Sequence, residues 1–164
     1  MEYRIAETKD IPQLMELGLL AYGEYFPILE DEHQQTMENN LKKAELYELM
    51  MKTGKGFIAT LDHQIIGMGF LIYSGNPNHI YPANWSYIRM IGINPKFKGQ
   101  GIASKITGLC IEEAKNKNES VVGLHTSEMM AAAQHIYKKL GFVIEKELDL
   151  IFGKRYWLFK LELN

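Results

Sequence analysis

A stretch in the middle of the chain constrains the fold most, because an apolar strand, a glycine loop and a helix start follow one another directly. Residues 85–93 are apolar and rich in β-branched and aromatic side chains, which predicts a buried strand. From residue 102 to residue 116 the apolar side chains recur at helical spacing. The N–H groups that are free at a helix start, together with the helix dipole, form a site for a phosphate. Gly99 and Gly101 let an anion approach the main chain, and Lys98 adds a cation at the rim.

Two common phosphate motifs are excluded for this loop. The Walker pattern G-x-x-x-x-G-K-[ST] does not occur in the chain, and a dinucleotide fingerprint needs a third glycine where Ala103 stands. Without further information the loop has two interpretations that stay open. It either binds an anion, or it is a helix entry that uses its glycines only to turn.

The overall composition is that of an ordinary globular protein. A length of 164 residues predicts a single domain over residues 1–164, and 46% hydrophobic residues are enough for a sizeable core. A net charge of −2 does not favour a nucleic-acid surface. Cys110 cannot form an internal disulfide and lies on an apolar helix face, which predicts a core residue. Because the N-terminus has no apolar signal region and no run approaches the ~20 residues of a membrane span, we expect a cytoplasmic protein.

The remaining segments predict alternating strands and helices. Thr8 is expected to cap a first helix, and a second helix is expected over residues 36–52, with Met37, Leu41, Ala44, Tyr47 and Met51 along one face. Strands are expected at residues 3–6, 56–61, 64–73, 120–125, 142–152 and 155–163, and a last helix capped by Ser127. This order predicts an α/β (α+β) fold, with a mixed, largely antiparallel central sheet and helices on both faces.

Two motifs resemble signatures of one known family. Residues 98–103 (KGQGIA) resemble the Q/R-x-x-G-x-G/A segment of the GNAT (Gcn5-related) N-acetyltransferases, and residues 133–142 (AQHIYKKLGF) resemble their later A-x-x-x-Y-x-x-L-G-F signature. Lys98 stands where that pattern prefers Gln or Arg. The similarity is residue-specific only between Ile88 and Phe142, although the order of elements matches over the whole chain.

The resemblance implies the GNAT acyl-CoA acyltransferase fold, acetyl-CoA as co-substrate and no metal. It implies that the glycine loop cradles the pyrophosphate and that the main chain of the preceding strand binds the pantetheine arm. Gly92 interrupts that strand, which is typical of a bulge or a close backbone approach. The cofactor-binding residues implied in this way are Ile91, Gly92, Ile93, Lys98, Gly99, Gln100, Gly101, Ile102, Ala103 and Ser104.

Tyr137 matches the tyrosine acid of the family. With a pKa near ~10 against ~8.5 for a thiol, full proton donation would be uphill by roughly 2 kcal/mol. Tyr137 is therefore expected either to donate a hydrogen bond to the leaving thiolate or to have a lowered pKa. A core tyrosine on an apolar helix face is the structural alternative. Met130 replaces an asparagine common in the family, which removes one expected contact to the cofactor.

No general base can be named from the sequence. Some family members carry a glutamate on the strand before the glycine loop, but residues 85–93 contain no acid. The candidates are His125 and the acidic link between the first two helices, with Glu24, Glu30, Asp31, Glu32 and His33. Each of these residues has a structural or solvated alternative.

The function expected from these observations is transfer of an acetyl group from acetyl-CoA to a primary amine of a small molecule or of a peptide or protein N-terminus. The alternatives are a CoA-binding regulatory or interaction module without turnover and a nucleotide-phosphate binder. The acidic link predicts a cationic amine as the acceptor, with a solvated acidic turn as the alternative. No nucleic acid or membrane partner is expected, and a homodimer stays open. The loop of residues 74–84 is either functional or an inert insertion.

Overall fold

The computed structural model describes residues 1–163, which form seven strands, five α-helices and three short 3₁₀ helices. The bounds are β1 (Glu2–Ile5), α1 (Ile11–Gly23), α2 (Asp31–Leu41), α3 (Ala44–Thr53), β2 (Gly54–Leu61), β3 (Gln64–Ile72), β4 (Ser86–Ile93), α4 (Ile102–Asn116), β5 (Val121–Ser127), α5 (Ala131–Lys139), β6 (Val143–Glu147) and β7 (Tyr156–Glu162). The 3₁₀ helices are Thr8–Asp10, Phe26–Ile28 and Pro95–Phe97.

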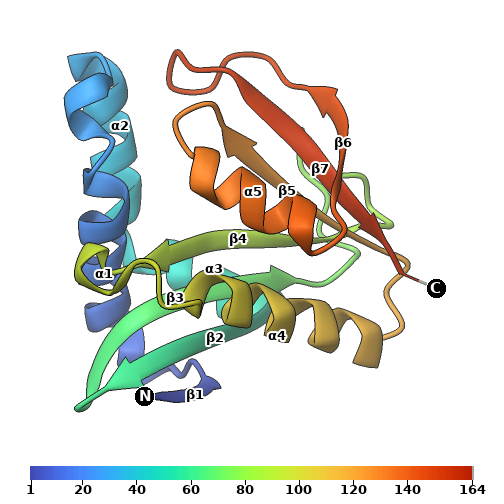
Figure 1. Ribbon diagram of the computed structural model, residues 1–164, viewed down its shortest axis with the longest axis horizontal. Coiled ribbons are helices and arrows are strands. Elements are labelled where there is room, and N and C mark those ends of the chain that lie inside the picture. The colour runs from blue at the N-terminus through green and yellow to red at the C-terminus, as the bar shows by residue number, and fades with distance from the viewer. Residues whose placement is uncertain (164) are drawn as a thin grey trace.

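All seven strands belong to one sheet in the order β1-β2-β3-β4-β5-β7-β6. Every neighbouring pair is antiparallel except β4 and β5, which are parallel and pair only at Ser86–Val122 and Tyr87–Gly123. Beyond this seam the two strands diverge, so the sheet opens into a wedge with α4 over one half and α5 over the other (Figure 1). The predicted mixed sheet is confirmed.

A hydrophobic core lies on each face of the sheet. On one face α1 and α3 pack against β3, with Leu14, Leu17, Tyr47, Met68 and Phe70 fully buried or nearly so. On the other face α4 and α5 cover a second core, with Ile66, Ile88, Ile106, Cys110 and Phe159 at its centre. Burial raises the pKa of the Cys110 thiol, as the predicted core position implies.

The predicted second helix is wrong, because residues 36–52 form parts of two helices. α2 starts five residues earlier than expected and ends at Leu41, and Lys43 is extended before α3 begins. The hydroxyl of the fully buried Tyr47 donates a hydrogen bond to the Leu41 carbonyl (3.2 Å), which satisfies an acceptor that the break would otherwise leave unpaired. The interruption also shifts the helical phase, so Met50 is buried instead of Met51.

Three other predicted boundaries differ from the structure. Thr8 lies inside the first 3₁₀ helix and does not cap α1; the Asp10 carboxylate closes that turn by accepting the Glu7 N–H (2.7 Å). Ser127 accepts the Met129 N–H (3.2 Å) but still pairs with Tyr156 in the sheet, so α5 starts only at residue 131. The strand expected over residues 142–152 ends at Glu147, and the rest forms the connection to β7.

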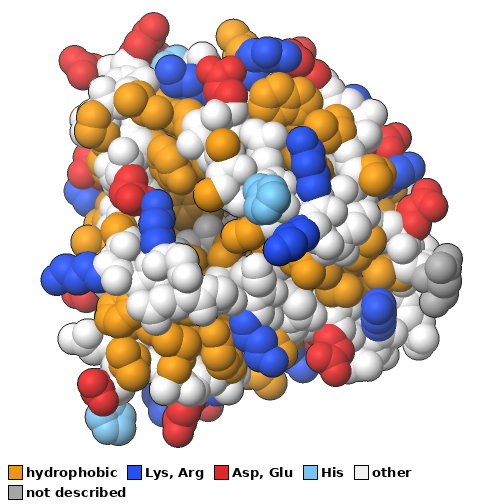
Figure 2. Space-filling model, viewed as in Figure 1, with side chains coloured by type: hydrophobic (Ala, Val, Ile, Leu, Met, Phe, Trp, Pro, Cys, Tyr) orange, Lys and Arg blue, Asp and Glu red, His pale blue; other side chains and the backbone are white. Residues whose placement is uncertain are grey.

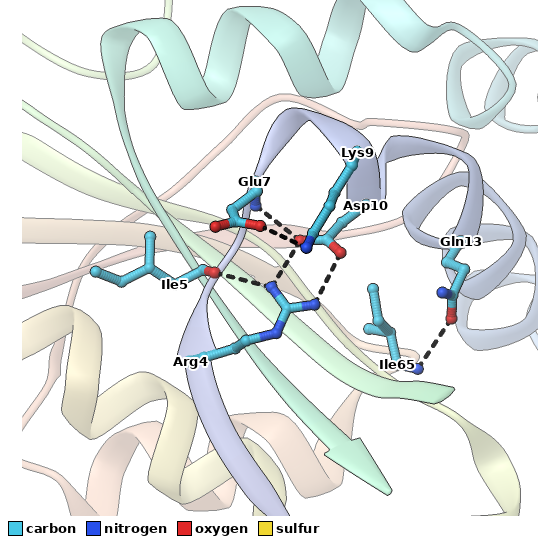
Figure 3. A network of polar contacts seen from close by, with 7 residues as sticks. All are labelled: Arg4, Ile5, Glu7, Lys9, Asp10, Gln13 and Ile65. Carbon is cyan, nitrogen blue, oxygen red and sulfur yellow. Dashed lines mark hydrogen bonds and ion pairs between the residues drawn. The ribbon is translucent and has the colours of Figure 1, made fainter. Parts of the chain in front are cut away.

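A buried carboxylate ties the first strand to the first long helix. Asp10 accepts hydrogen bonds from both terminal nitrogens of Arg4 at 2.8 Å, in addition to the Glu7 N–H (Figure 3). One turn later the Gln13 side chain accepts the Ile65 N–H (3.1 Å), which attaches α1 to β3. These contacts fix the position of α1, one wall of the site described below.

Asp10→Ala should lower the free energy of unfolding at pH 7 by about 1–3 kcal/mol, towards the lower end because the Arg4 side chain is 41% exposed. The Arg4 hydrogen bonds hold the pKa of Asp10 below its usual range, so this contribution is present above about pH 4 and is lost as the pH falls through the folded-state pKa. Urea unfolding should therefore show a difference between parent and variant that shrinks below pH 4. The matched control is Glu147→Ala, which removes an exposed ion pair with Arg155 and should change little. Equal parent and Asp10→Ala curves at pH 7 would contradict the expectation.

Candidate active site

A cavity of about 410 Å³ occupies the wedge between β4 and β5. Its walls contain Tyr137 and every predicted cofactor residue except Gln100. Further parts of the walls come from α1, α2, α5 and β5, with single residues from α3 and β7. Figure 2 shows a hollow of this kind with hydrophobic side chains around it. The structure therefore brings together the predicted cofactor residues and Tyr137, which lie up to 46 positions apart in the sequence.

The glycine loop has the geometry that an anion cradle requires. Gly99 and Gly101 have φ values of +78° and +79°, and a Cβ at either position would meet no heavy atom within 4 Å. Gly101 lies at the N-cap of α4, and within residues 1–163 no backbone or side-chain acceptor takes the N–H groups of residues 99–104. The residues present fit a pyrophosphate, because open space, unpaired N–H groups and the positive end of a fifteen-residue helix coincide.

The cation at the rim of this loop is already paired. Lys98 Nζ lies 2.5 Å from a carboxylate oxygen of Glu24, which follows α1. The contact joins the glycine loop to the first helix across the mouth of the cavity. Lys98 and Glu24 are thus partners, although the sequence suggested separate roles for them at the cofactor and at the acceptor.

The irregularity predicted at Gly92 lies two residues earlier. The pairing of β3 with β4 shifts between Met68 and Phe70, and Met90 has a φ of +59°, a conformation that costs a non-glycine residue roughly 1–3 kcal/mol. Gly92 instead allows a close approach, since a Cβ there would lie 3.1 Å from Met68 Cε and 3.2 Å from Ala21 Cβ. The bulge and the close packing hold the edge of β4 that faces the wedge in a fixed position.

Tyr22 of α1 supports the same edge from the side of the helix. Its hydroxyl donates a hydrogen bond to the Ile91 carbonyl (3.1 Å), so this carbonyl already has a partner. Burial raises the pKa of Tyr22, which keeps the hydroxyl protonated and able to donate. The sequence contains no signal for this contact, because its two residues are 69 positions apart.

Tyr137 lies on α5 with its ring in the second core and its side chain in the cavity wall. The ring packs edge-on against Phe142 (6.0 Å between centroids) and Phe159 (6.5 Å). Burial raises the pKa of Tyr137, which favours a protonated hydroxyl over the lowered pKa considered from the sequence. The geometry supports hydrogen-bond donation into the cavity.

Only two of the candidate bases line the cavity, namely Glu24 and His125. Glu24 is held by Lys98. His125 accepts or donates a hydrogen bond with the Tyr81 hydroxyl (2.5 Å), and burial, followed by the charges of Arg89 and His79, lowers its pKa to about 4, so it is neutral at pH 7. The other four candidates do not line the cavity: Glu30 precedes α2, and Asp31, Glu32 and His33 lie in its first turn.

The loop of residues 74–84 is packed against the sheet, and whether it has a function stays open. Asn78 accepts the N–H groups of Ile80 and Tyr81 (2.8 and 2.9 Å), and the Tyr87 hydroxyl donates to the Asn76 carbonyl (2.9 Å). The fully buried Tyr81 ring stacks on Tyr87 with centroids 4.0 Å apart. The loop thus places a tyrosine hydroxyl on His125, at the edge of the cavity.

The described part of the chain contains neither a cluster of metal-ligating side chains nor a membrane-spanning helix. Within residues 1–163, no three His, Cys, Asp or Glu side chains gather as a metal site would require. No helix in the same range has both the length and the apolar character needed to cross a membrane. That the protein uses no metal remains a prediction.

Known proteins share this architecture. The structure is similar to that of the PaiA N-acetyltransferase of Thermoplasma acidophilum in complex with coenzyme A, with a TM-score of 0.79, 16% identity and coverage of 99% of this chain and all of that one. It is also similar to the ribosomal-protein-S18-alanine N-acetyltransferase of Escherichia coli, with a TM-score of 0.72, 14% identity and coverage of 98% and 92%. These likenesses establish the fold.

Sequence comparison reaches further than the fold. The chain is 37% identical over 62 residues to N-alpha-acetyltransferase 30 of Schizosaccharomyces pombe; the match covers 38% of this chain and 41% of that protein. The model of the acetyltransferase (GNAT) family matches residues 15–142, which include most of α1 and both sequence signatures. Since that match covers most of the chain and includes nearly all the residues of the cavity, the chain belongs to the acetyltransferase (GNAT) family.

Proposed function

We propose that this protein transfers the acetyl group of acetyl-CoA to a primary amine of a small molecule or of a peptide or protein N-terminus. The observation that carries the proposal is the continuity of one cavity from the glycine loop, along the open edge of β4, to the Tyr137 side chain. Family membership and the coenzyme A held by the Thermoplasma relative support acetyl-CoA as the donor. The yeast and bacterial relatives, named as N-terminal and ribosomal-protein acetyltransferases, support an amine as the acceptor.

The residues of the cavity have separate roles in this proposal. The unpaired N–H groups of residues 99–104 hold the pyrophosphate, and the edge of β4 at residues 91–93 aligns the pantetheine arm. Acetyl-CoA supplies an activated thioester when bound. The Tyr137 hydroxyl donates a hydrogen bond to the sulfur as negative charge develops on it. Tyr22 keeps the Ile91 carbonyl occupied, which fixes the edge of β4.

The acceptor amine has to lose a proton before it attacks. Neither Glu24 nor His125 is a strong free base, since Glu24 is ion-paired and the pKa of His125 is about 4. We propose that the amine arrives neutral or loses its proton to water, at a cost of about 1.4 kcal/mol at pH 7 for an α-amino group near ~8. An α-amine is therefore a better acceptor than a lysine side chain near ~10.4, which would cost about 4.6 kcal/mol.

The test is thiol release from acetyl-CoA in the presence of a panel of amines, combined with calorimetry of coenzyme A binding. Binding together with amine-dependent thiol release is the expected result, with α-amines turning over faster than ε-amines. Binding without release for any amine would show a coenzyme A-binding module instead. Absence of binding would overturn both.

A further inference from the structure

Arg89 is a half-buried cation that has no partner. It lies on β4, and within residues 1–163 it forms neither an ion pair nor a hydrogen bond through its side chain. No side-chain nitrogen in this range is both fully buried and unsatisfied, so the guanidinium reaches open space. A planar group with five donors next to a cavity is suited to a carboxylate, which it binds through two parallel hydrogen bonds.

Two cavities meet at Arg89. The second, of about 350 Å³, lies between the end of α3 and the loop of residues 74–84. Arg89 is the one residue of the described chain that lines both this cavity and the larger one containing Tyr137. Arg89 therefore lies between the larger cavity and an approach from the side of α3.

The surroundings of Arg89 supply no negative charge. The second cavity is lined by apolar and neutral polar side chains, and the one carboxylate in the wall of the larger cavity, Glu24, is paired with Lys98. Burial raises the pKa of Tyr81 and of Tyr87 and lowers that of His125, and the positive charge of Arg89 is near enough to act on all three. Its neighbours are therefore neutral hydrogen-bonding groups, and the positive charge is available to a ligand.

The pyrophosphate of coenzyme A is not the ligand that Arg89 fits. The glycine loop leaves the far end of β4 after Ile93, four residues from Arg89, which corresponds to about 13 Å along a strand. The bulge at Met90 also places Arg89 on the face of α1 and α3, whereas Ile88 and Ile91 both pack in the core under α4. In contrast, Ile91, which is assigned with Gly92 and Ile93 to the pantetheine arm, is only two residues away, or roughly 7 Å along the strand, although its side chain lies on the other face of β4.

We propose that the acceptor is a primary amine that also carries a carboxylate, and that Arg89 binds this carboxylate. The assignment rests on the proposed acetyl transfer, because it locates the amine at the end of the pantetheine arm. It replaces the cationic acceptor predicted from the acidic link, since Glu30, Asp31 and Glu32 do not line the cavity. The same chemistry is found in free amino acids and in peptide N-termini followed by an acidic residue.

The test compares acceptors matched except for this charge, with kcat/KM expressed per neutral amine, because amidation also lowers the pKa of the α-amine. Free amino acids are assayed against their C-terminal amides, and hexapeptides beginning Ser-Glu or Ser-Asp against those beginning Ser-Gln or Ser-Asn. In the native protein kcat/KM should favour the carboxylate of each pair by about 10- to 100-fold, the size of a charge-assisted bidentate contact. The pair with the larger ratio identifies the small-molecule or the peptide source.

Arg89→Gln should reduce this ratio to about 1, mainly by raising KM for the carboxylate, and should leave the amide acceptors and coenzyme A affinity unchanged. Arg89→Lys should keep part of the preference, because it retains the charge without the two-pronged geometry. The matched control is Arg155→Gln, which removes an exposed arginine paired with Glu147 and should preserve the full ratio. A native protein that does not discriminate between acids and amides would overturn the proposal, even if Arg89→Gln failed to fold.

A binding measurement separates this proposal from the proposed function. N-Acetylated amino acids and their amides are titrated into the complex of the protein with coenzyme A, without any turnover. Arg89-dependent binding of the acids in the absence of acetyl transfer would retain the carboxylate site and overturn the proposed function. Transfer to amines without any preference for carboxylates would retain the proposed function and overturn the carboxylate site.

Discussion

Gly101→Asp is expected to abolish detectable binding of coenzyme A. Gly101 lies at the N-cap of α4 with a φ of +79°, and its Cβ position opens into space that the structure leaves free. An aspartate there would place a negative charge where the pyrophosphate has to lie, so like charges would meet at short range at the start of the helix. Titration calorimetry with coenzyme A measures the effect.

Gly101→Asn is the matched control for this prediction. Asparagine and aspartate have nearly the same shape, and both tolerate left-handed backbone better than other side chains, so the fold should survive in each variant. Gly101→Asn should therefore retain clearly more affinity than Gly101→Asp, and the difference isolates the charge. Gly75→Asp, at a second glycine with positive φ and open surroundings, should leave the affinity unchanged. Parental affinity in Gly101→Asp would disprove the cofactor assignment of this loop.

Tyr137→Phe is expected to lower kcat by on the order of 10²-fold or more while preserving the affinity for acetyl-CoA. Phenylalanine keeps the edge-on contacts with Phe142 and Phe159, so the change removes one hydroxyl from the wall of the cavity and little else. Single-turnover kinetics with a saturating amine measure the chemical step. If the rate stays within about threefold of the parent, Tyr137 is a packing residue and water protonates the leaving group.

Tyr47→Phe should have the opposite effect to Tyr137→Phe, because it should change stability and leave kcat unchanged. Tyr47 is fully buried away from the cavity, and its hydroxyl donates to the Leu41 carbonyl at the end of α2. Its loss should lower the free energy of unfolding by about 1–3 kcal/mol, because it leaves a buried acceptor unpaired, and should not change kcat. A loss of stability in one variant and of rate in the other would separate a structural hydroxyl from a catalytic one.

Segments in which the hydrophobic residues follow one clear period could be predicted from the sequence. β4, the glycine loop and α4 were predictable because apolar runs, glycines and helical spacing agree there. The break between α2 and α3 was not, since the apolar stripe continues through Lys42 and Lys43, and only the buried contact between Tyr47 and Leu41 shows why the helix stops. Tertiary packing overrides local periodicity at such a position.

The candidate site also has parts that the sequence predicts and parts that it does not. The predicted site residues of the two signatures line the cavity apart from Gln100, although Ala133, Ile136 and Tyr137 are the residues of the later signature that do so. Contacts between distant segments left no local trace, so the pairing of Lys98 with Glu24 and of Tyr81 with His125 had to come from the structure. Arg89 shows a further limit, because an arginine in an apolar strand has the same sequence context whether or not a carboxylate faces it.

Because β4 and β5 pair over a short length, a ligand bound between them would help to hold the two halves of the sheet together. Only two residue pairs join the two halves of the sheet there, so a molecule that spans the open edges adds a connection that the polypeptide lacks. A ligand that binds only the folded protein stabilises it by RT ln(1 + [L]/Kd), or about 2.7 kcal/mol at a hundredfold excess over Kd. For a domain of ordinary stability that is a large share of the total. The lifetime of this protein in a cell would then follow the supply of acetyl-CoA, so that its abundance as well as its rate reports the metabolic state.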